Sequence, residues 1–184
     1  MNINYHTKPK IKIEKRLLLF YLLISGFQVL AQNNLEILDY KSSKINGIIS
    51  NSLSRTSLIK LLGKPDKIEN FDPECGLTDK QEKAKIKRIF YYGKTTFFVF
   101  DNNAELSSIS FVSSRFTYNS SLINLSFKTT LKDLQKVFPK SVKNAIKENG
   151  GKLIRLKTCK NCDDEYHLYI EKGILVKLEL WNDC

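Results

Sequence analysis

One pattern, an amphipathic helix followed by alternating strands, occurs twice in this chain and limits the folds open to it. The segment Thr56–Pro65 resembles Thr129–Pro139, and each contains two leucines spaced i, i+3, as one face of a helix requires. The spacing between the two segments predicts a repeat of about 70 residues. Chance similarity between two amphipathic helices is the alternative. The aligned leucines are Leu58 with Leu131 and Leu61 with Leu134.

Each predicted helix is followed by segments in which apolar and polar residues alternate, as in strands with one buried face. We therefore expect an α+β fold with two tandem units, each a helix followed by antiparallel strands, and with the helices packed on one face of the sheet. The predicted strands are Ile86–Tyr92, Thr95–Phe100 and Leu106–Val112 in the first unit, and Leu153–Thr158, Tyr166–Ile170 and Ile174–Trp181 in the second.

The unit boundaries follow from composition. The first helix-plus-sheet unit is expected over residues 32–118 and the second over 119–184. Residues 72–85 are predicted to form a charged loop, and the Ser/Asn-rich residues 113–128 a link between the units. Pro139 is expected to stop or break the second helix, because proline lacks the amide hydrogen that the helix needs.

The N-terminus has the three parts of a secretory signal. Five basic residues among the first 16 precede the apolar run Leu17–Ala31, and Val29 and Ala31 suit a cut before Gln32. The apolar run is shorter than the roughly 20 residues of a membrane-spanning helix. We predict that residues 1–31 are a cleaved signal peptide, with an uncleaved anchor as the alternative. The protein would be exported, periplasmic or secreted, with no stable membrane span after cleavage.

The chain is basic, with a formal net charge of +11 at pH 7 over 184 residues. Removing the predicted signal takes away five bases and one acid, which leaves +7. A basic exported protein favours acidic partners, such as anionic lipid, anionic polysaccharide or an acidic face of another protein. Nucleic acid is not an expected partner outside the cytoplasm.

Four cysteines in an exported chain indicate two disulfides, with three possible connectivities. Cys159 and Cys162 lie at a predicted hairpin turn rather than at a helix start, which disfavours thioredoxin-like chemistry. A zinc site from the cysteines, or from three of them with His167, is the weaker alternative because a second Cys-x-x-Cys is lacking. The disulfide candidates are Cys75, Cys159, Cys162 and Cys184.

No catalytic motif is present in the sequence. There is no Gly-x-Ser-x-Gly elbow, P-loop or dinucleotide glycine pattern. His167 is the one histidine after residue 31, and the acidic run Asp163–Glu165 is more typical of a solvated turn than of a metal site. We expect no catalytic residue, no metal and no cofactor.

Strand alternation predicts one face of the sheet that the helices leave open. In Val176–Trp181, Val176, Leu178 and Leu180 share one face, while Lys177, Glu179 and Trp181 share the other. In the preceding strand, His167 and Tyr169 alternate with apolar neighbours in the same way. Aromatic side chains beside charges are typical of interaction surfaces. Coverage of the C-terminal strand edge by Trp181 is the structural alternative.

The string from Thr56 to Asp66, Thr-x-Leu-x-x-Leu-Leu-Gly-Lys-Pro-Asp, resembles the helix-then-sheet unit of small bacterial envelope proteins. That unit occurs in the small lipoprotein of the outer-membrane barrel assembly machine, and two in tandem resemble the β-lactamase inhibitor protein fold. The second copy departs from the motif at Phe138–Ser141. Glu74–Gly76 also resembles an element of an uncharacterised family of exported bacterial proteins. These resemblances imply binding rather than catalysis.

The function expected from these features is that of a non-enzymatic exported protein that binds another envelope or secreted protein, with an acidic partner favoured by the basic charge. The alternatives are a structural envelope factor that binds anionic polymer or lipid through its lysines, and a small hydrolase that uses His167.

Overall fold

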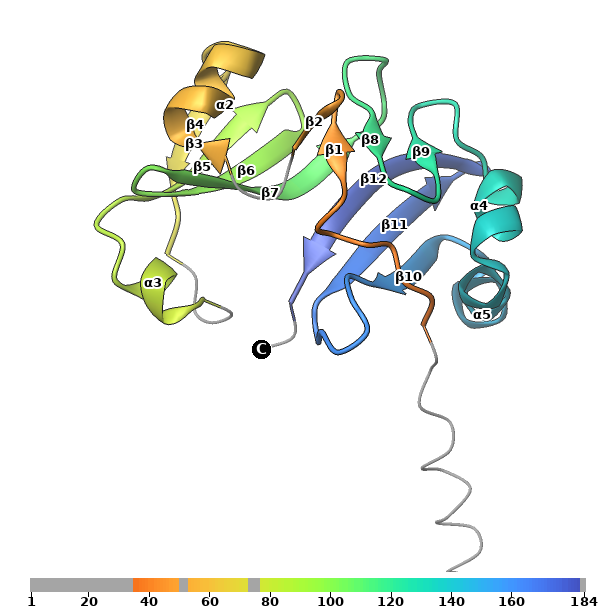
Figure 1. The fold of residues 1–184 in the computed structure, drawn as a ribbon. Helices are drawn as coiled ribbons and strands as arrows, with labels where there is room; N and C mark the ends of the chain where they lie inside the picture. The colour runs from red at the N-terminus through yellow and green to blue at the C-terminus, as the bar shows by residue number, and fades with distance from the viewer. Residues whose placement is uncertain (1–34, 50–52, 73–76, 183–184) are drawn as a thin grey trace, which may run out of the picture. The chain divides into compact units, whose positions relative to one another are not determined.

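Antiparallel pairing of consecutive strands builds the main sheet of this protein (Figure 1). The computed structural model describes residues 35–49, 53–72 and 77–182, so the predicted signal peptide, Cys75 and Cys184 lie outside the described residues. The sheet has the order β10-β11-β12-β7-β6-β5-β4, and β3 also pairs with β7. The strands are β3 Leu53–Ser54, β4 Lys67–Asn70, β5 Lys87–Tyr92, β6 Thr95–Phe100, β7 Asn103–Ser110, β10 Leu153–Lys157, β11 Glu165–Glu171 and β12 Ile174–Trp181.

A second, small sheet has the order β2-β1-β8-β9, with β1 at Lys44–Ile45, β2 at Ile48–Ile49, β8 at Tyr118–Asn119 and β9 at Asn124–Leu125. Strands β8 and β9 fall in residues 113–128, which the sequence predicted to be a simple link. The prediction is wrong because this segment holds two apolar side chains, Tyr118 and Leu125, that are fully buried. Burial of these side chains in the core stabilises the segment in a fixed position, where β8 and β9 pair with each other.

Among the described residues, the helices that pack on one face of the large sheet are α2 Arg55–Leu62, α4 Leu131–Val137 and α5 Pro139–Asn149. Ser54 caps α2 by accepting a hydrogen bond from the Ser57 amide, and Thr130 and Asp133 form a capping box on α4. Pro139 ends α4, as expected, but it also begins α5. Proline is tolerated in the first helical turn because the amides there have no partner in the helix.

A short helix, α3 Asp79–Glu82, lies within residues 72–85, where the sequence predicted only a loop. The reason is a Thr-x-x-Gln capping box: the Thr78 amide donates to Gln81 Oε1 at 2.8 Å, and the Gln81 amide donates to Thr78 Oγ1 at 3.4 Å. Gln81 also donates to Glu105 on β7. Helix α3 is therefore tied to the side of the sheet that the other helices leave open.

The hydrophobic core lies between the large sheet, the helices α2, α4 and α5, and the small sheet. At its centre the buried hydroxyls of Tyr118 and Tyr166 are hydrogen-bonded at 2.8 Å, which joins the two sheets. Mostly antiparallel strands with a few helices confirm the α+β class. No helix in residues 35–49, 53–72 and 77–182 combines the length and the apolar character needed to cross a membrane.

Candidate binding cleft

A break in the strand ladder on β7 positions the candidate site. Strand β12 pairs with β7 over Ser108–Ser110, and β3 pairs with β7 over Asn103–Ala104. Residues 105–107 of β7 lie between these two pairings. On the edge of β7 that faces β12 and β3, no strand among the described residues pairs with them. A register shift between Thr96 and Phe97 of β6 marks a bulge in the same region. Bulges re-aim side chains and often lie beside functional sites.

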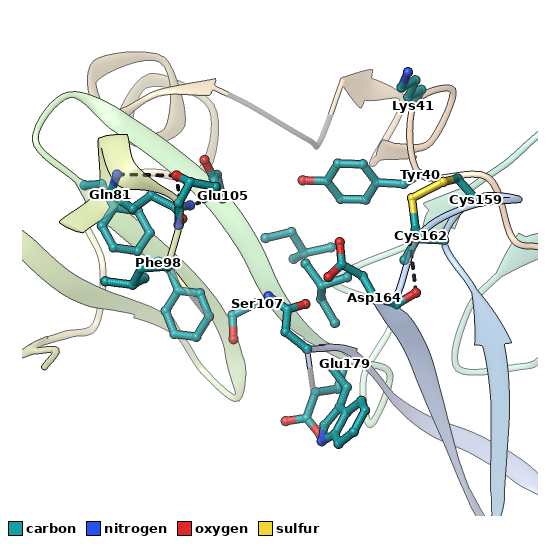
Figure 2. A pocket seen from close by; sticks show the side chains of 18 of the residues that line it. Tyr40, Lys41, Gln81, Phe98, Glu105, Ser107, Cys159, Cys162, Asp164 and Glu179 are labelled. Atoms are coloured by element: carbon teal, nitrogen blue, oxygen red, sulfur yellow. Dashed lines mark hydrogen bonds between the residues drawn. A yellow bond between two sulfur atoms is a disulfide. The ribbon is translucent and has the colours of Figure 1, made fainter. Parts of the chain in front are cut away.

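A cleft of about 710 Å³ occupies this break. Figure 2 shows Glu105, Gln81 and Phe98 on one wall, and Tyr40, Asp164 and the Cys159–Cys162 bridge on the other. Within the part of the chain that the structure describes, six aromatic side chains line it, three from the β6 side and three from the β11–β12 side or the N-terminal segment. They are Phe71, Phe98, Phe100, Tyr40, Tyr169 and Trp181. The cleft thus opens on the side of the sheet opposite the core helices.

The strand register brings the five predicted binding residues onto one face. Strands β11 and β12 pair Tyr169 with Lys177, and His167 with Glu179, while Trp181 lies opposite Glu165. Tyr169, Glu179 and Trp181 line the cleft, whereas His167 and Lys177 are held behind them by contacts with these residues.

The prediction of an exposed His167 has to be corrected, because this residue is only 8% exposed. Its ring stacks on Trp181 with centroids 5.0 Å apart, and Nε2 lies 3.3 Å from Glu165 Oε2. Burial lowers the pKa of His167, although the neighbouring Glu165 carboxylate opposes this effect. His167 therefore supports the Trp181 ring rather than offering a free side chain to a ligand.

Glu165 is a buried carboxylate that the sequence placed in a solvated acidic turn. It is 7% exposed, and Arg155 of β10 binds it with two hydrogen bonds, of 2.6 Å from Nε and 2.9 Å from Nη2. Burial alone would raise the pKa of Glu165, but the Arg155 guanidinium lowers it below its usual value. This ion pair fixes the start of β11 under the Trp181–His167 stack.

Both carboxylate oxygens of Glu179 also accept hydrogen bonds within the protein. Its two oxygens accept hydrogen bonds of 2.7 Å from the Tyr169 hydroxyl and from Lys177 Nζ. The Lys177 ammonium lies 4.8 Å from the centroid of the Tyr169 ring. Burial would raise the pKa of Glu179, but these two donors lower it. Three of the five predicted residues therefore form one preorganised cluster at the edge of the cleft.

Glu105 is the charged cleft residue that the sequence did not single out. The predicted strand began at Leu106, three residues after the observed start of β7 at Asn103, so a carboxylate inside a strand was overlooked. Gln81 Nε2 donates to Glu105 Oε2 at 2.8 Å, and Oε1 accepts no hydrogen bond from any residue that the structure describes. Burial raises the pKa of Glu105, against the opposing effects of Gln81 and the Lys80 charge.

Tyr40 closes the cleft from the N-terminal segment, and its hydroxyl is directed across the cleft toward Glu105 (Figure 2). Its backbone amide donates to the Thr158 carbonyl at 3.2 Å, which anchors the segment beside the end of β10. Burial raises the pKa of Tyr40 to about 12, and the negative charges of Glu105 and Asp164 add to this effect. Tyr40 therefore stays protonated at neutral pH.

Cys159 and Cys162 form a disulfide on the rim of the cleft, with Cα atoms 5.2 Å apart. This pair was one of the bridges allowed by the sequence. The other two candidates, Cys75 and Cys184, lie outside the described residues. Among residues 35–49, 53–72 and 77–182 there is no group of three His, Cys, Asp or Glu side chains placed to hold a metal ion.

Comparisons of the chain with protein families, with curated proteins and with solved structures find no significant match. The resemblances drawn from the Thr56–Asp66 string and from Glu74–Gly76 therefore stay predictions.

Proposed function

We propose that this protein is a non-enzymatic binding protein whose cleft face engages another protein of the bacterial envelope or secreted space. The observation that carries the proposal is the cleft of about 710 Å³, lined by six aromatic rings and by charged side chains, on the sheet face that the core helices leave open. Binding energy at protein interfaces concentrates in aromatic and charged anchors of this kind.

The arrangement around His167 supports binding over hydrolysis. Among the described residues, the side chain of His167 hydrogen-bonds only to Glu165. A nucleophilic mechanism needs a histidine within hydrogen-bond reach of a serine or cysteine. The described residues do not provide that pair, so the hydrolase alternative has no supporting geometry.

The export of the protein is part of the proposal. It rests on the basic residues and the apolar run Leu17–Ala31 of the N-terminus. Intact-mass analysis of the protein made in its native host should give a chain that begins at Gln32. A full-length chain that stays with membranes would show instead that residues 1–31 are an anchor.

We also propose that the fold arose from two tandem units. Helix α2 precedes β4–β7, helices α4 and α5 precede β10–β12, and the last strands of the two sets, β7 and β12, pair side by side. This order of elements supports the proposal, whereas the aligned leucines differ in burial: Leu58 and Leu134 are buried, but Leu61, the counterpart of Leu134, is 44% exposed. The short helix α3 and the small sheet are additions that a strict repeat does not contain.

The binding proposal is tested by capture from the envelope fraction of the native host on the immobilised protein. Trp181→Ala should weaken retention of the captured protein by at least about thirtyfold, because truncating an interface anchor costs about 2 kcal/mol or more. Circular dichroism should show that the variant stays folded. If the variant binds as well as the wild type, the cleft face is not the binding surface.

The alternative, anionic polymer or lipid bound through lysines, predicts the reverse ranking. Lys132 and Lys136 are exposed on α4, on a different surface from the cleft. Replacing both by Gln should have a small, salt-dependent effect if the cleft binds the partner. A decisive loss in this variant, with Trp181→Ala silent and elution by high salt, would favour the polymer or lipid alternative.

A further inference from the structure

The charges of the cleft differ in sign from the charge of the chain as a whole. Among the described residues, the charged ones that line it are three carboxylates, Glu105, Asp164 and Glu179, and one lysine, Lys41. The whole chain has a formal net charge of +11 at pH 7. With Glu179 paired to Lys177, Glu105 and Asp164 still outnumber Lys41, and a cleft in which negative charge prevails attracts ligands of positive charge. The net basic composition therefore describes the rest of the surface and not this site.

The three carboxylates are not equally available to a ligand. Glu179 has both oxygens occupied by Tyr169 and Lys177. Glu105 uses one oxygen for Gln81, while no described residue donates to the other. Asp164 is exposed at the opposite wall. A ligand that enters the cleft thus meets two carboxylates with accepting capacity, one on each side.

The surroundings favour an organic cation over a bare metal ion. Within the described residues the carboxylates do not converge with other His, Cys, Asp or Glu side chains in a metal-binding group. The walls between them are aromatic, formed by Phe98, Phe100 and Tyr40 among others. Long cationic side chains bury an apolar stem along such surfaces and keep the charged end at a carboxylate, and aromatic faces attract the cation itself.

We infer that the cleft receives a lysine or arginine side chain presented by the partner protein, with the apolar stem against the aromatic walls and the charged group between Glu105 and Asp164. This inference rests on the proposed function, because it names the chemical group of the partner that the cleft face engages. It also differs from the sequence-based expectation of an acidic partner, which took only the net charge into account.

The test uses the fluorescence of Trp181, which lines the cleft and is the single tryptophan of the chain. The probe is an acetylated and amidated Gly-Arg-Gly peptide, titrated at low salt beside matched peptides that carry lysine, glutamate or citrulline in the middle position. Citrulline has nearly the shape of arginine but no charge. The arginine and lysine peptides should give a saturable change in emission, and the citrulline peptide should bind at least about tenfold more weakly.

Glu105→Gln should weaken binding of the arginine peptide by about tenfold or more while leaving citrulline binding nearly unchanged. The substitution keeps a hydrogen-bonding group for Gln81. Asp164→Asn is an independent second variant on an exposed residue and should act in the same direction. Glu171→Gln is the matched control, because Glu171 is exposed at the other end of β11 and does not line the cleft.

Equal affinity for the arginine and citrulline peptides would overturn the inference. So would arginine binding that neither Glu105→Gln nor Asp164→Asn weakens. If Trp181→Ala abolishes capture of the envelope protein but the arginine peptide does not compete with it, the proposed function stands and this inference fails. Competition by the arginine peptide that Glu105→Gln removes would support both.

Discussion

The two faces of the large sheet use similar residues in different ways. On the face toward α2, α4 and α5, side chains such as Leu168 and Leu178 are fully buried, and their neighbours are apolar. On the opposite face, Glu165, His167 and Glu179 are also largely withdrawn from water, but hydrogen bonds and ring stacking hold each of them. Burial of apolar surface stabilises the first face. On the second face, burial of polar groups around the cleft costs free energy, which their hydrogen bonds offset.

Two adjacent residues of β11 test this comparison with the largest expected effect. Leu168→Ala should lower the free energy of unfolding by about 2–5 kcal/mol, because it leaves a cavity in the core. Tyr169→Ala removes a partly exposed ring and one hydrogen bond to Glu179, and should cost only about 1 kcal/mol. Urea unfolding of the two variants measures both values. Equal losses would show that the cleft face is a second core.

The disulfide at the cleft rim gives the next largest effect. Replacing Cys159 and Cys162 by Ser should lower the unfolding free energy by about 2 kcal/mol, at the low end of the usual range because the bridge closes a short loop. Urea unfolding without reductant is the measurement. An unchanged midpoint would mean that the bridge constrains neither the rim nor the unfolded chain.

A thiol count accompanies this prediction. Denatured but unreduced protein should show no free thiol, because the sequence predicts two bridges and, with Cys159 and Cys162 joined, the second would link the remaining candidates Cys75 and Cys184. Two free thiols would refute the second bridge and keep Cys159–Cys162. Four free thiols with stoichiometric zinc would refute both.

Arg155 supports the cleft face through Glu165. Arg155→Met leaves a carboxylate that is 7% exposed without its two strongest hydrogen bonds. The expected loss is about 1–2 kcal/mol, reduced from the usual value for charged partners because 42% of the arginine side chain is exposed to screening solvent. Adding Glu165→Gln should recover part of the loss in the same unfolding assay. No recovery would mean that Arg155 acts through packing alone.

The smallest effect concerns pH. Burial lowers the pKa of His167 in the folded protein, while Glu165, Arg155 and Glu179 are the charged groups that face it. The unfolded chain therefore binds a proton more readily than the folded one, and stability falls as the pH drops below about 6.5 and through the lower folded pKa. His167→Gln should reduce this slope between pH 7 and 5.5. An unchanged slope would contradict the assignment of this pH dependence to the lowered pKa of His167.

The sequence predicted the parts of this picture that depend on local periodicity. Alternation in Ile174–Trp181 placed Lys177, Glu179 and Trp181 on one face, and the structure has the same strand bounds. The cleft could not be predicted from local periodicity. It depends on where β12 stops pairing with β7 and on Tyr40, which is distant from both strands in the sequence. The burial of His167 was equally non-local, since the Trp181 ring of the next strand covers it.

The measurement that tests the central claim most directly is the accessibility of Trp181 in the complex. Acrylamide quenching of its fluorescence should be substantial in the free protein, and should fall, with a blue shift of the emission, when the captured envelope protein is added in excess. Because the chain contains one tryptophan, a tryptophan-free partner or a fluorinated Trp181 label assigns the signal to the cleft. Quenching that stays the same while gel filtration shows a stable complex would contradict the claim that the cleft face is the binding surface.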